Sequence, residues 1–121
     1  MTRALLCATS AVLLQTGCST VDTTTFDSAN PIHCMVIFGI AAKTAKQISQ
    51  PPVAEQMMRR FSALADHHGG SVWLAEINAE ALAVADRMDA ANDRKATIQL
   101  LEGCEAAQDA DPTMRAKVRQ R

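Results

Sequence analysis

The feature that most constrains this chain is an apolar stretch from Cys34 to Ala42, the most hydrophobic run outside the N-terminus. It begins with a cysteine, and a second cysteine, Cys104, lies near the other end of the chain. A chain of 121 residues forms one domain at most. Any fold for it must therefore bury this stretch in a single small core and place Cys34 relative to Cys104.

The composition favours helices over sheets. The chain has three Phe, one Trp and no Tyr, and it is rich in Ala, Leu and Met. A scarcity of aromatic and β-branched residues argues against a sheet protein. The net charge of −1 gives the chain no overall nucleic-acid-binding character. We therefore expect an all-α domain that does not bind nucleic acid.

Local signals predict four helices, at about 31–49, 52–67, 72–90 and 93–109. Asn30 is a suitable N-cap, and Pro31 suits the first helical position. Pro51 and Pro52 end the first helix and start the second, and Gly69 supplies the left-handed residue that ends the second. Asp111-Pro112 ends the fourth helix, and the remainder from Thr113 to Arg121 is expected to be frayed.

Each predicted helix has an apolar face. These faces are formed by Cys34, Phe38, Ala41, Ala45 and Ile48; Val53, Met57, Phe61, Leu64 and His68; Trp73, Ile77, Ala81, Val84 and Met88; and Ile98, Leu101, Cys104 and Ala107. The first half of the first helix is apolar nearly all round, which is typical of a helix enclosed by other helices or by a partner. In the second helix, Arg59 and Arg60 are expected at the surface.

The N-terminus has the pattern of a signal peptide over residues 1–17. A positive start at Arg3 precedes an apolar run of about eleven residues from Ala4 to Leu14. Such a run is too short to span a bilayer, which needs about 20 apolar residues. A charged start, a short apolar core and small residues after it indicate export.

The segment Leu14-Gln15-Thr16-Gly17-Cys18-Ser19 resembles the lipobox of bacterial lipoprotein precursors. Gly17 and Cys18 match that pattern, whereas Gln15 departs from it, because an aliphatic residue is usual there. The resemblance implies a lipid at Cys18, and Ser19 implies the outer membrane under the enteric sorting rule. The alternative is ordinary secretion with cleavage near Cys18, which would give a soluble periplasmic or secreted protein. Under the lipobox interpretation, residues 18–30 are the lipidated cysteine and a polar, flexible tether.

The remaining cysteines form an even pair in an exported protein. Cys7 leaves with the signal peptide and Cys18 takes the lipid, so Cys34 and Cys104 are expected to form a disulfide. A disulfide needs Cα atoms within about 7 Å. A helix unbroken from residue 72 to 108 would be roughly 55 Å long and would carry Cys104 far from Cys34. We therefore predict a break near 90–93 and an up-and-down four-helix bundle over residues 31–110.

A metal site is a second interpretation of the same residues. In the four-helix arrangement, His33, His67 and His68 would come to the same end as the two cysteines. Two thiolates and two imidazoles suit zinc, or a soft copper site with Met35 added. An oxidised cysteine pair cannot bind a metal, so the disulfide hypothesis leaves the protein without a metal or cofactor.

No catalytic pattern is present in the sequence. The chain has no phosphate-binding glycine loop, no Cys-x-x-Cys and no His-Glu-x-x-His.

Residues 111–121 are expected to form a basic tail. The tail carries cations that would suit anionic headgroups close to a lipid anchor, namely Arg115, Lys117, Arg119 and Arg121.

Together these features predict a non-enzymatic cell-envelope lipoprotein that acts as an accessory or adaptor for another envelope protein. By architecture it resembles the pilotin type of secretion-system lipoprotein, which implies a groove that holds a helix of the client. The alternative is a soluble periplasmic protein that carries metal or acts as a stress chaperone.

Overall fold

A computed structural model describes residues 25–120 of the 121, and all regular structure within that range is helical. The helices are α1 (Pro31–Gln47), α2 (Pro51–His68), α3 (Ser71–Ala91), α4 (Arg94–Ala110) and α5 (Pro112–Gln120). The all-α prediction is confirmed, and the bounds of the first four helices lie close to those expected. The described chain has five helices rather than four, because the expected frayed tail is helical.

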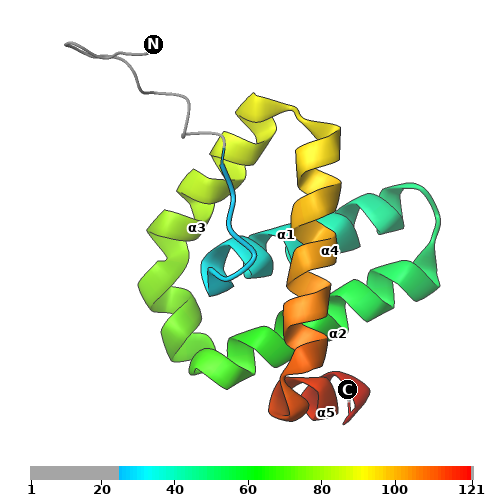
Figure 1. The fold of residues 1–121 in the computed structure, drawn as a ribbon, viewed down its shortest axis with the longest axis vertical. Coiled ribbons are helices and arrows are strands. Elements are labelled where there is room, and N and C mark those ends of the chain that lie inside the picture. Colours follow the sequence, from blue (N-terminus) through cyan, green and yellow to red (C-terminus); the bar gives the residue numbers. More distant parts are fainter. Residues whose placement is uncertain (1–24, 121) are drawn as a thin grey trace.

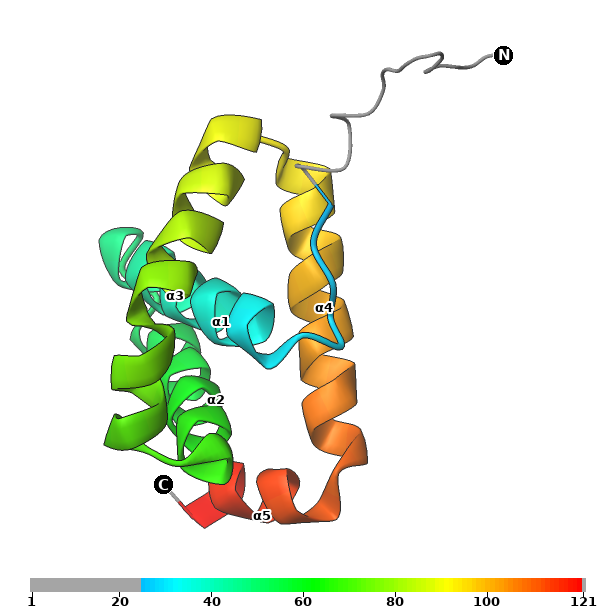
Figure 2. The same ribbon diagram turned by 90° about the vertical axis from the view of Figure 1, so that its left-hand side faces the viewer.

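The helix α1 lies at the centre of the molecule. Figures 1 and 2 show it passing between α3 and α4, with α2 running back along it as the second arm of a hairpin. Six consecutive residues, from His33 to Phe38, are buried, and Phe38 is fully inaccessible to solvent. The apolar first half of α1 is therefore enclosed by the other helices of its own chain.

The predicted break between α3 and α4 is present. Asn92 adopts a left-handed conformation with φ of 46°, and the side chain of Asp93 accepts a hydrogen bond from the Ala96 N–H at 3.0 Å. From this turn the two helices diverge, and each packs on α1 (Figure 1). In an up-and-down bundle, helices that follow one another pack side by side. The observed bundle departs from that order, because α1 separates α3 from α4.

Residues 112–120 form α5 because Asp111 caps it. The Asp111 carboxylate accepts hydrogen bonds from the N–H groups of Thr113 and Met114 at 2.9 and 3.2 Å, and Pro112 occupies the first helical position. The same pattern starts α1, where the Asn30 side chain accepts from the Ile32 N–H at 2.9 Å. The expectation of a frayed tail is wrong for residues 113–120, because Asp111-Pro112 both ends α4 and starts α5.

Three large apolar side chains of the predicted faces are exposed. Ile48, just after α1, is 62% exposed, Val53 on α2 is 45% exposed and Ile98 on α4 is 42% exposed, although all three were expected in the core. The buried face of α4 consists of Leu100, Cys104 and Gln108, at a spacing of four residues. The core face of α4 is therefore rotated relative to the expected one and includes a polar residue. On α3 the prediction holds better, with Ile77, Val84 and Met88 all buried.

Candidate functional site

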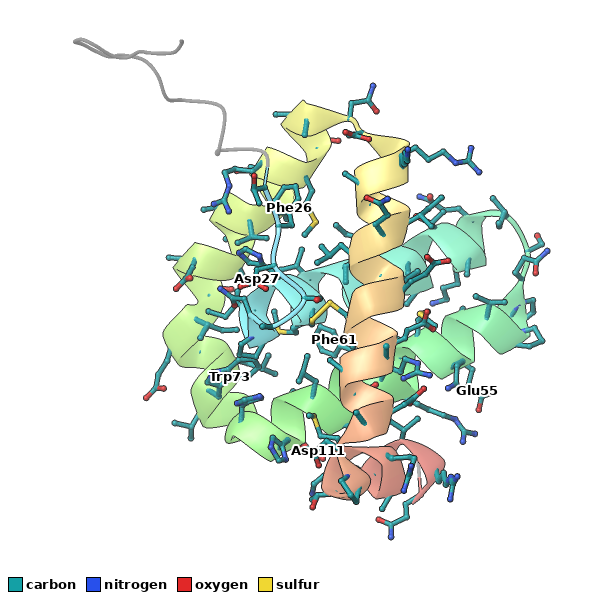
Figure 3. The ribbon with its side chains drawn as sticks, viewed as in Figure 1. Phe26, Asp27, Glu55, Phe61, Trp73 and Asp111 are labelled. Atoms are coloured by element: carbon teal, nitrogen blue, oxygen red, sulfur yellow. A yellow bond between two sulfur atoms is a disulfide. The ribbon has the colours of Figure 1, made fainter. Side chains whose placement is uncertain are left out.

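The disulfide between Cys34 and Cys104 joins the first turn of α1 to α4. The two Cα atoms are 5.4 Å apart, and both residues are buried. Figure 3 shows the bond where the start of α1 passes α4. The predicted pairing is confirmed. Because both sulfur atoms are oxidised, neither cysteine is a thiolate ligand for zinc or copper.

A buried arginine ties α2 to the end of α4. Arg60 is only 8% exposed, so the expectation that it lies at the surface was wrong. Its Nη1 donates to Gln108 Oε1 at 2.9 Å and to Asp109 Oδ1 at 3.0 Å. Its Nε, which has no hydrogen-bond partner, lies 3.5 Å from Glu105 Oε2. These contacts make Arg60 a structural residue, whereas its neighbour Arg59 is more exposed and pairs with Glu55 at 3.0 Å.

Residues 25–30, the end of the expected tether, pack against the domain. The Asp27 N–H donates to His33 Nδ1 at 2.9 Å, and the ring of Phe26 meets the His33 ring edge-on at 5.8 Å (Figure 3). The Arg87 guanidinium lies 5.7 Å from the centre of the Phe26 ring. Burial lowers the pKa of His33, and the positive charge of Arg87 lowers it further, while Asp27 and Glu80 oppose the shift. His33 is therefore held as a neutral hydrogen-bond acceptor.

The other two histidines lie at the turn between α2 and α3. The His68 ring stacks on Trp73 at 4.9 Å and meets the His67 ring edge-on at 5.1 Å. Burial lowers the pKa of His68, and the neighbouring His67 lowers it further. His68 lines a cavity of about 160 Å³ together with Cys34 and Cys104, so one expected histidine does come to the cysteine pair.

The three histidines do not assemble into one site. His33 lies against Phe26 and Asp27, whereas His68 stacks on Trp73. Within residues 25–120, no group of three or more His, Cys, Asp or Glu side chains is placed to hold a metal ion.

The clearest candidate for a binding site is a groove between α1 and α2, which we call the hairpin groove. It has a volume of about 680 Å³, within the range of about 300–1,000 Å³ found for ligand pockets. It is lined by Gly39, Ala42, Lys43, Lys46, Pro51, Ala54, Glu55 and Met58. The side chains at the floor of the groove are small, because Gly39, Ala42 and Ala54 contribute at most a methyl group each.

Exposed apolar side chains cluster on the same hairpin. Ile48 is 62% exposed and Met58 is 48% exposed, in addition to the displaced Val53. Lys43 and Lys46 add exposed positive charge on the α1 side of the groove. Figure 1 shows the hairpin extending beyond α4 at the right of the molecule. The hairpin thus presents an apolar and cationic surface to solvent.

A second groove lies on the other side of the second half of α1, where α3 and α4 diverge. Its volume is about 510 Å³, and its apolar lining includes Ile40, Met88 and Ile98. Asp89 and Arg94 also line it, and Lys43 lines both grooves. Local sequence patterns did not predict either groove, because each depends on how the faces of separate helices pack against each other.

Comparisons with known proteins identify no relative. No protein-family model matches the chain, and no curated protein or solved structure is significantly similar to it. The resemblance to pilotins therefore gains no support from these comparisons. The predicted signal peptide, the lipobox-like segment with Cys18, residues 20–24 of the expected tether and Arg121 lie outside the described residues. In the described part of the chain, no helix is both long enough and apolar enough to cross a bilayer.

Proposed function

We propose that this protein is a non-enzymatic lipoprotein of the cell envelope that binds another envelope protein through the hairpin groove. The observation that carries the proposal is the groove itself, with its small lining residues and the exposed Met58. Val53 and Ile48 are exposed on the same hairpin, and exposed apolar surface on a small protein is typical of an interaction site. The first 19 residues support the envelope location, because they have the pattern of a signal peptide followed by a lipobox-like segment. That pattern implies a lipid at Cys18 and an anchor on the periplasmic side of the outer membrane.

The shape of the groove favours a helix as the bound element. Two packed helices leave a long concave valley, and an amphipathic helix fills such a valley with its apolar face. Met58 at the edge adapts to different apolar surfaces, because its side chain is unbranched and flexible. The buried disulfide and Arg60 support the scaffold without lining this groove.

Photo-crosslinking in cells tests the binding proposal. A photoreactive residue would replace Met58, and the control would carry it at Val72, which is 65% exposed on α3. We expect a discrete crosslink to one envelope protein from position 58 only. The same crosslinks from both positions, or none from position 58, would contradict the proposal.

Metabolic labelling with palmitate tests the anchor separately. We expect the label on the wild-type protein and its loss in the Cys18→Ser variant, which should be recovered in the soluble periplasmic fraction. An unlabelled wild-type protein would indicate ordinary secretion instead of lipidation. The proposal that the groove is the binding site would be unaffected.

A further inference from the structure

We infer that the segment held in the hairpin groove is a two-turn amphipathic helix with carboxylates along the flank that faces Lys43 and Lys46. This inference rests on the proposed binding function of the groove and adds the chemistry of its partner. The argument comes from the length of the groove, the size of its floor residues and the charge of its edges.

The length of the groove matches two turns of helix. On α1 its lining runs from Gly39 to Lys46, and on α2 it runs from Pro51 to Met58. Each span covers eight residues, or about 10 Å from its first to its last residue at the helical rise of 1.5 Å per residue. A bound helix placed along the valley would therefore make contact over about two turns. Its apolar residues would be spaced by three or four positions.

The groove leaves room for large apolar side chains of the partner, because its volume is about 680 Å³. Its lining includes small residues, of which Ala42 and Ala54 are almost covered, at 4% and 7% exposure, while Gly39 faces the ring of Phe61. Large residues of a partner can pack against such small ones, because large and small side chains interdigitate across an interface. Met58 and Pro51, at the two ends of the α2 lining, add larger apolar side chains.

The edges of the groove carry unbalanced positive charge. Lys43 and Lys46 are both exposed, and neither has an ion-pair partner within residues 25–120. They are three residues apart on α1, so their side chains project from the same face. The acid on the opposite edge, Glu55, is already paired with Arg59 at 3.0 Å. A partner with carboxylates one turn apart on one flank would complement the two free ammonium groups.

A helix suits this surface better than a flat membrane does. The apolar atoms of the groove floor lie below its edges, since Ala42 and Ala54 are buried while Lys46 and Met58 are exposed. A planar headgroup layer would touch the lysines and leave the floor empty. A convex helix fills the floor and reaches the lysines at the same time.

Selection from a peptide library tests the inference. We would use the Cys18→Ser protein, expressed with its own signal peptide and purified without detergent. It would be exposed to a library of displayed peptides held in a helical scaffold, with all surface positions of the helix randomised. We expect the enriched peptides to combine an apolar stripe with Asp or Glu along one flank. Lys43→Glu with Lys46→Glu should weaken their binding about tenfold, whereas Lys95→Glu, a control on α4, should leave it unchanged.

The outcomes separate this inference from the proposed function. One outcome is that the enriched peptides bind through Met58, so that Met58→Asp abolishes their binding, and yet lack an acidic flank. That result would overturn the charge inference and leave the groove as a binding site. If no enriched peptide depends on Met58, the binding proposal itself fails. Lysine-dependent binding to anionic phospholipid vesicles without any enriched peptide would overturn the inference in favour of a lipid surface.

Discussion

Arg60 and Gln108 form a reciprocal pair across 48 residues of sequence. Arg60 Nη1 donates to Gln108 Oε1 at 2.9 Å, and Gln108 Nε2 donates back to the Arg60 carbonyl oxygen at 2.9 Å. Both residues are buried, Gln108 at only 2% exposure. The pair therefore satisfies polar groups that would otherwise be buried without partners, and it holds α4 against α2.

Breaking this pair should be costly, and replacing it should cost less. Gln108→Leu removes both hydrogen bonds and leaves a buried Arg60 N–H without its acceptor, which we expect to lower the unfolding free energy by about 2–3 kcal/mol. The double variant Arg60→Met with Gln108→Leu should lose clearly less than the sum of its two single variants, because the N–H group left without an acceptor is gone as well. Urea unfolding of all four proteins measures this coupling. Additive losses would mean that the two side chains do not depend on each other.

The disulfide should contribute a large part of the stability. It closes a loop with a sequence separation of 70 residues, for which the chain-entropy model gives roughly 4.4 kcal/mol as an upper figure. Small domains are stable by only about 5–15 kcal/mol. We expect a reductant to lower the Tm of the wild-type protein strongly. The Tm of Cys104→Ala should already be low and should not respond to reductant, and a wild-type Tm that ignores reductant would refute the role of the bond.

Gly103 on α4 should resist replacement by alanine. In an exposed helix this change stabilises by about 1 kcal/mol. Here a Cβ at Gly103 would lie 2.9 Å from the Cβ of Ser28, which is too close for two carbon atoms. We expect Gly103→Ala to lower the unfolding free energy, as measured by chemical denaturation. Ser28→Gly in the same chain should recover the loss. A stabilising Gly103→Ala would show that residues 25–30 move away at little cost.

Stability should fall as the pH drops below about 6.5, because the folded protein holds His33 neutral. Its pKa in the folded state is lowered by burial and Arg87, whereas the unfolded chain takes up a proton at the ordinary value near 6.5. The unfolded state therefore binds more protons in that range, and the unfolding free energy rises with pH. Protonation also turns Nδ1 into a donor that can no longer accept from the Asp27 N–H.

Urea unfolding at about pH 7.5 and about pH 5.5 measures this dependence. His33→Gln keeps an acceptor for the Asp27 N–H and does not titrate, so the stability of this variant should vary less with pH. His68→Gln is the matched control, because the pKa of His68 is also lowered and must account for part of the remaining slope. A His33→Gln variant with the full wild-type dependence would assign the effect to other groups.

Much of the local structure could be predicted from the sequence. Asn30 followed by Pro31 marks the start of α1, Gly69 follows the end of α2, and the constraint from the two cysteines predicted the turn at Asn92. These features depend on short-range chemistry, namely a side chain that caps nearby N–H groups or a residue that accepts a left-handed conformation. The start of α5 at Asp111 carries the same capping signal, so it could also be predicted from the sequence.

The sequence by itself determined the first four helices, their approximate bounds and the pairing of Cys34 with Cys104. Only the tertiary structure decided that α1 separates α3 from α4, that Arg60 is buried opposite Gln108, and that an apolar groove lies open between α1 and α2. The reason is that caps and turns depend on neighbours within a few residues. Burial and grooves depend on how the faces of whole helices pack against each other, which one helix's apolar spacing does not specify.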